Sequence, residues 1–191
     1  MNVNSDQTRD ELWRWRTCVH EAGHAVAAVL LGLPGHGCVV FPNADGLATT
    51  GDVALARQGR ELPPEYEDKK LAAAYKGHQW PDLLANATMT AAGFAAEDLL
   101  LDTARELTRV VFGDRASLEA CAREAIWPYC DEKVEVAFAY LASARARVLL
   151  TPFTAAIERV ARRLDRKSRL TADEVVAAGW PEHSTRKESQ T

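Results

Sequence analysis

The run Thr17–Ala27 contains the pattern H-E-x-x-H among apolar residues spaced as in a helix. Residues four apart on a helix lie one turn above each other, so His20 and His24 can present two imidazole nitrogens to one cation. Zinc accepts imidazole nitrogen at about 2.0–2.1 Å, and a catalytic zinc site has three protein ligands and a position for water. Glu21 is placed to take a proton from that water. The alternative is a helix whose histidines bind nothing.

Length and composition predict one globular domain over residues 1–191, with its core at about residues 10–180 and frayed ends. The 191 residues are 47% hydrophobic, which is enough to fill a core. The formal net charge of -4 and the lack of a basic stripe give no reason to expect a nucleic-acid partner. The longest apolar run, Ala25–Leu33, is shorter than the roughly 20 residues of a membrane span. A cytoplasmic protein without a membrane span is expected.

The four cysteines have no C-x-x-C spacing and lie in apolar stretches. This pattern is typical of reduced thiols packed in a core, rather than of a disulfide framework or a cysteine zinc site. The residues concerned are Cys18, Cys38, Cys121 and Cys130.

Apolar periodicity and end signals predict a mainly α fold. The expected helices are residues 10–32, a short one near 66–75 within a surface loop (57–79), and then 81–100, 113–127, 131–150, 152–164 and a last one from 171. A small β-hairpin or sheet edge is expected after the first helix, from Cys38–Phe41 with Gly51–Leu55 as its partner. Residues 167–170 are expected to form a loop.

The helix expected at 81–100 is apolar over most of its surface, which predicts a core position. Its small residues Ala91–Gly93 would let it lie close to the H-E-x-x-H helix. Gly23 costs that helix about 1 kcal/mol against alanine, which indicates either a close backbone or substrate, or simple helix packing. The acids Glu97 and Asp98 have three interpretations: a metal ligand, a partner that orients a ligand histidine, or a solvated helix end.

The run Cys18–Val26 resembles the zinc helix of the FtsH-type peptidases, the proteolytic part of the membrane-bound AAA+ zinc proteases. Further stretches resemble that family in the same order over roughly residues 15 to 178; they are Val39–Pro42 with Gly46-Leu47, Ala92–Leu99, Ala139–Ala144, Ile157–Leu164 and Leu170–Val175. The resemblance implies a compact helical zincin-like metallopeptidase that binds Zn2+ and holds its polypeptide substrate extended along a strand edge.

The resemblance also implies a third zinc ligand, an aspartate at the start of a helix that follows the core helix. Asp114, after Gly113, occupies that place. The loop from Glu97 is a few residues longer than the family pattern, and an alignment by helix register would bring Ser117 to the ligand position instead. Glu97 is the alternative carboxylate, and His36 and His78 are further nitrogen donors in turn-like segments.

The chain departs from the family in one further respect, because it contains no G-x-x-x-x-G-K-[ST] phosphate-binding loop. The expected activity is therefore hydrolysis of unfolded or flexible polypeptides, or of substrates delivered by an ATPase on a separate chain. Two other hypotheses stay open: a binding or regulatory domain that has this fold without catalysis, and a zinc hydrolase of non-peptide amides. The sequence gives no oligomeric state.

Overall fold

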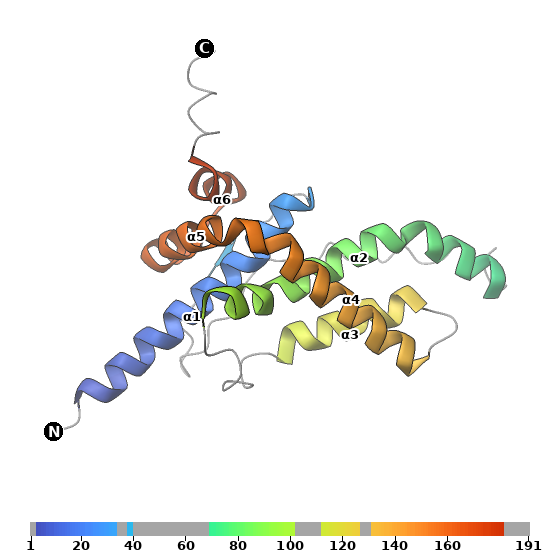
Figure 1. The fold of residues 1–191 in the computed structure, drawn as a ribbon, viewed down its shortest axis with the longest axis horizontal. Helices are drawn as coiled ribbons and strands as arrows, with labels where there is room; N and C mark the ends of the chain where they lie inside the picture. The colour runs from blue at the N-terminus through green and yellow to red at the C-terminus, as the bar shows by residue number, and fades with distance from the viewer. Residues whose placement is uncertain (1–2, 34–37, 40–68, 102–111, 127–130, 182–191) are drawn as a thin grey trace, which may run out of the picture.

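The computed structural model describes residues 3–33, 38–39, 69–101, 112–126 and 131–181 of the chain. This part is mainly α, as predicted (Figure 1). The elements in chain order are α1 (Val3–Leu30), β1 (Cys38–Val39), α2 (Lys69–Leu100), α3 (Phe112–Ile126), α4 (Glu132–Leu150), a 3-10 helix (Thr151–Phe153), α5 (Thr154–Lys167), β2 (Arg169–Leu170) and α6 (Ala172–Gly179).

Helices α1 and α2 form the centre of the structure (Figure 1). Helix α1 packs against α2 and α5, while α2 also packs against α3 and α4. The larger core cluster joins α1, α2, α5 and α6 around fully buried side chains such as Met89, Ile157 and Leu164. A smaller cluster joins α2, α3 and α4 around Phe138. None of the helices that the structure describes has the length and apolar character needed to cross a membrane.

The contact between α1 and α2 is made by small residues. Ala22, Ala92 and Ala96 are all fully buried there. A Cβ atom added at Gly23 would lie 2.6 Å from both the carbonyl oxygen of Ala92 and the Cβ of Ala96. The two backbones are therefore too close for any side chain at position 23. This explains why glycine stands inside a helix despite its cost, and it confirms the expected close approach of the two helices.

Helix α1 is longer at its start than predicted and ends at Leu30, two residues before the predicted end. It begins at Val3 rather than near Asp10. No proline or glycine interrupts the polar residues before Asp10, and extending a helix costs far less than nucleating one. At the other end Gly32 adopts a left-handed conformation with φ of 66°. Leu33 N–H donates to Ala28 and Gly32 N–H to Val29, which is the Schellman arrangement.

The short helix predicted near 66–75, within the loop 57–79, and the helix predicted at 81–100 are parts of one helix, α2, which continues through Pro81. The prediction was wrong because Pro81 was assigned to the first turn of a new helix, its most favourable helical position. The segment before it is rich in alanine and lysine, both strong helix formers, so the helix extends back to Lys69. A proline inside a helix removes one hydrogen bond but does not have to end it.

The predicted β-type segment at Cys38 is present as β1, but its partner is β2 near the end of the chain. The two strands pair antiparallel, with Cys38 opposite Leu170 and Val39 opposite Arg169. The loop expected at 167–170 is thus partly a strand. Ser168 ends α5 with φ of 59°, and the following residue pair is extended with Leu170 fully buried. The hairpin partner predicted at 51–55 lies outside the described residues.

Polar end signals confirm the starts of the last helices. Asp131 caps α4 by accepting hydrogen bonds from the backbone N–H groups of Lys133 and Val134. Thr171 and Glu174 form the predicted capping box at the start of α6. These signals act within one turn of the chain, which is why the sequence was enough to find them.

Two of the predicted core thiols, Cys18 and Cys38, are buried and reduced, and Cys121 is partly buried. Burial raises the pKa of both Cys18 and Cys38 to about 12, so neither is a ready nucleophile. Cys130 lies outside the described residues.

We expect Gly23→Ala to destabilise the protein by about 1–3 kcal/mol, because the added methyl group would force α1 away from the backbone of α2. Urea unfolding followed by circular dichroism measures this change. Gly179→Ala is the matched control, since its Cβ would meet Val160 at an ordinary 3.6 Å. Equal stability of the Gly23 variant and wild type would contradict the close packing described above.

Candidate metal centre

The two histidines of the H-E-x-x-H motif point from α1 toward α2 and α3. Their Nε2 atoms lie 3.1 Å apart, and the residues are only 9% (His20) and 5% (His24) exposed. The rings meet edge to face, with centroids 4.7 Å apart. The four-residue spacing thus brings both imidazoles to one point, as the sequence predicted.

The other nitrogen of each ring is held by α2. His20 Nδ1 lies 2.6 Å from Oε1 of Glu97, and His24 Nδ1 lies 2.7 Å from the carbonyl oxygen of Met89. Oxygens of a carbonyl or a carboxylate accept hydrogen bonds, so each Nδ1 carries the proton and donates it. When a ring is neutral, the lone pair is therefore on Nε2, and the Nε2 atoms of the two rings face each other. Partners of this kind fix the tautomer and orientation of metal-binding histidines.

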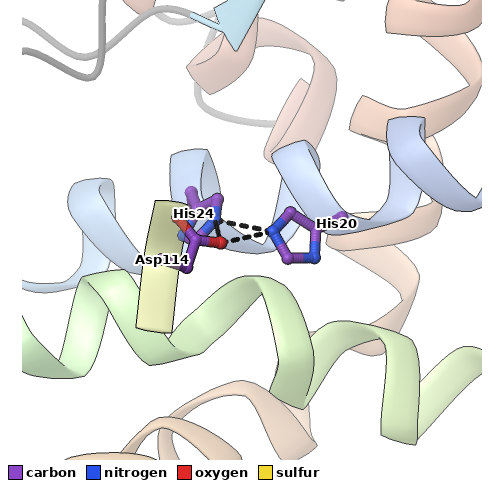
Figure 2. A group of neighbouring side chains, drawn as sticks. All are labelled: His20, His24 and Asp114. Atoms are coloured by element: carbon purple, nitrogen blue, oxygen red, sulfur yellow. Dashed lines mark hydrogen bonds and ion pairs between the residues drawn. The ribbon is translucent and has the colours of Figure 1, made fainter. Parts of the chain in front are cut away.

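Asp114 completes the group from the first turn of α3 (Figure 2). Its Oδ2 lies 2.7 Å from Nε2 of His20 and 3.1 Å from Nε2 of His24. Ligands of a tetrahedral zinc ion stand about 3.3 Å apart, given bonds of about 2.0–2.1 Å. The observed separations are a few tenths of an ångström shorter, so a small outward movement would make room for the ion.

Glu21 is 5% exposed and lies on the turn that carries the two histidines. Burial raises the pKa of Glu21, and the nearby His24 and His20 partly oppose this rise. Its Oε2 atom is buried without a hydrogen-bond partner among the described residues. A buried carboxylate oxygen without a partner is costly, and a water or ligand beside the histidines would satisfy it.

Space for the imidazoles depends on Gly93 of α2. A Cβ at this position would lie 2.5 Å from Nε2 of His20 and 2.6 Å from Nε2 of His24. Any other residue would overlap both prospective ligand atoms. Phe94 beside it packs edge-on against the His20 ring, with centroids 5.2 Å apart. The face of α2 that lies against α1 therefore accommodates the two imidazole rings closely.

The two histidines and Asp114 interact through hydrogen bonds and charge, which shift the pKa of all three. Burial would lower the pKa of His20, but hydrogen bonds to Asp114 and Glu97 outweigh it and raise the pKa to about 10. For His24 the effect of burial is likewise outweighed by the hydrogen bond to Asp114, which raises its pKa. Burial would raise the pKa of Asp114, yet the two histidines hold it well below the usual range. A divalent cation would take over the role of these protons.

The structure brings together three of the residues selected from the sequence. The donor atoms of His20, His24 and Asp114 all lie within 4.8 Å of one another. Ser117 follows Asp114 by three residues on α3, and it is Asp114 that contacts the histidines. That these residues bind a metal stays a prediction.

The remaining candidates have other positions. Glu97 lies on the Nδ1 side of His20, away from the point where the two Nε2 atoms meet. Of its three interpretations, this position favours a partner that orients a ligand histidine. Asp98 is half exposed and faces Arg147 of α4 at 3.7 Å. His36 lies outside the described residues; the backbone of His78 is part of α2, but its side chain is not described.

Sequence analysis missed Arg16, which contacts Glu97 from α1. Its position four residues before His20, on the same helix face, was a signal that could have identified it. The carbonyl group of Met89 could not have been identified, because backbone acceptors carry no residue signature.

Neither the models of known protein families nor the curated proteins include a match to this chain. The resemblance to the FtsH-type peptidases therefore rests on the sequence motifs quoted above.

We expect zinc binding near neutral pH to release at least one proton, because His20 is protonated in the metal-free site and must give up the proton on Nε2 to bind. The affinity should accordingly fall as the pH is lowered. Calorimetric titration in two buffers of different ionisation enthalpy measures the released protons. Identical heats in the two buffers would show that His20 is already neutral and contradict this account.

Proposed function

We propose that this chain is a zinc-dependent metallopeptidase in which His20, His24 and Asp114 hold the ion and Glu21 is the general base. The observation that carries the proposal is the convergence of two Nε2 atoms and one carboxylate oxygen within 4.8 Å. Both rings are held at Nδ1, as expected of metal-binding histidines. Oε2 of Glu21 has no hydrogen-bond partner among the described residues, and this atom and the space beside Gly93 both support the proposal.

The chemistry follows from the positions of these groups. A bound zinc ion would polarise the scissile carbonyl group and make a neighbouring water more acidic. Glu21 would take a proton from that water as it attacks the carbonyl carbon, and would then deliver a proton to the leaving nitrogen. Burial suits Glu21 to this role, because a raised pKa makes its carboxylate a stronger base near neutral pH.

The substrate we propose is unfolded or flexible polypeptide. An extended peptide can add to the edge of a strand, and β1 follows the histidine helix closely in the chain. The resemblance to FtsH-type peptidases adds an ATPase as a partner, and the 191 residues contain no phosphate-binding motif of their own.

Metal content tests the site directly. Wild-type protein purified with zinc should contain close to one ion per chain, and Asp114→Ala should lose most of it, because two histidines alone leave a zinc site one ligand short. Elemental analysis gives the ratio. Asp98→Ala is the matched control, since this aspartate pairs with Arg147 at 3.7 Å instead. A wild type that takes up no zinc would favour the non-catalytic binding domain.

Glu21→Gln should keep the metal and lose nearly all turnover, because an amide cannot accept the proton of the attacking water. Digestion of casein, with and without a chelator, compares this variant with wild type. Glu158→Gln, a change on the exposed face of α5, should leave activity unaltered. Full activity of Glu21→Gln would show that the general base is wrongly assigned. Loss of both activity and bound metal would mean that Glu21 has a structural role.

A further inference from the structure

Helices α1 and α2 run antiparallel, with facing residues at regular spacing. Arg16, His20 and His24 are four apart on α1, and Met89, Gly93 and Glu97 are four apart on α2. Arg16 contacts Glu97 at one end of this interface, and His24 contacts Met89 at the other. Arg16 therefore lies one turn from His20, on the side away from His24.

The carboxylate of Glu97 joins Arg16 to His20. Oε2 accepts a hydrogen bond from Nε of Arg16 at 2.5 Å, and Oε1 accepts one from Nδ1 of His20 at 2.6 Å. The side chains of Arg16 and Glu97 are only 9% and 5% exposed. With a partner on each oxygen, the carboxylate cannot rotate without breaking one of the two contacts.

Arg16 is itself held in place. Its guanidinium carbon lies 5.6 Å from the ring centroid of Trp13, one turn earlier on α1, within the range of a cation–π contact. A carboxylate this deeply buried is costly unless a cation accompanies it. A guanidinium group stays charged at all ordinary pH values and suits this position better than an ammonium group.

We propose that Arg16 is a positioning residue for the metal centre. It acts through Glu97, whose orientation it fixes so that Glu97 holds His20 with Nε2 directed at the ion. The inference rests on the proposed metal site and goes beyond it, because Arg16 is not one of the proposed ligands and contacts Glu97 instead. Removing it should weaken metal binding while leaving every proposed ligand in the chain.

The test measures zinc affinity of the full chain by competition with a chromophoric chelator. Arg16→Met should bind zinc about 10-fold more weakly than wild type, the lower end of the 10–100-fold effect of losing a direct partner of a ligand histidine, because Arg16 acts on His20 through Glu97. Arg14→Met is the matched control, because Arg14 pairs with Asp165 of α5 at 2.6 Å, away from the metal site. It should bind zinc like wild type. Arg16→Lys, which restores the charge, should recover part of the loss.

A double variant shows whether Arg16 acts through Glu97. Once Glu97→Gln has weakened zinc binding, adding Arg16→Met should cause little further loss, whereas independent effects would multiply. Circular dichroism of the metal-free variants verifies that each is folded. Arg16→Gln, which keeps a donor and much of the length, replaces Arg16→Met if the latter does not fold.

The outcomes separate the two proposals. If wild type binds zinc and the Arg16 variants bind it equally tightly, the inference is overturned and the metal site stands. Multiplying effects in the double variant would also overturn it, since Arg16 would then act by another route. If wild type binds no zinc at all, the metal site and the role of Arg16 are overturned together.

Discussion

The close packing of α1 against α2 is the contact on which the other features of this structure depend. Buried alanines and Gly23 bring the two backbones together, so that Ala92 and Ala96 leave no room for a side chain at position 23. At this separation, groups of α2 reach the imidazoles of α1 directly. Met89 offers its backbone carbonyl group, and Glu97 offers its side-chain carboxylate. A wider spacing would separate the histidines from both acceptors.

The candidate metal centre combines this closely packed helix pair with one residue from elsewhere. His20, His24, Glu97 and Arg16 all belong to α1 and α2, where packing fixes their side chains, and Asp114 comes from the first turn of α3. Ion pairs between Asp114 and the two histidines hold this turn against the helix pair. Such preorganisation lowers the cost of binding an ion, because the ligands are already near the required geometry.

Predictions from the sequence succeeded where the signal is local. The four-residue spacing of the histidines, the glycine stop at Gly32 and the capping box at Thr171 each act within about a turn of chain. They failed where a local preference had two outcomes. Pro81 can start a helix or lie within one, and the preceding residues decide between these by extending the helix back to Lys69.

The sequence by itself determined the mainly α fold, through its apolar periodicity and helix end signals. It also determined that His20 and His24 share a helix face and that Glu21 lies beside them, because helical geometry alone fixes these relations. Tertiary structure decided which carboxylate faces the two Nε2 atoms and which one holds Nδ1. Glu97 and Asp114 were both candidates for the ion, and only the packing of α2 on α1 and of α3 on α2 assigns them to opposite sides of His20. The pairing of Cys38 with Leu170 is likewise a contact between distant segments that no local pattern encodes.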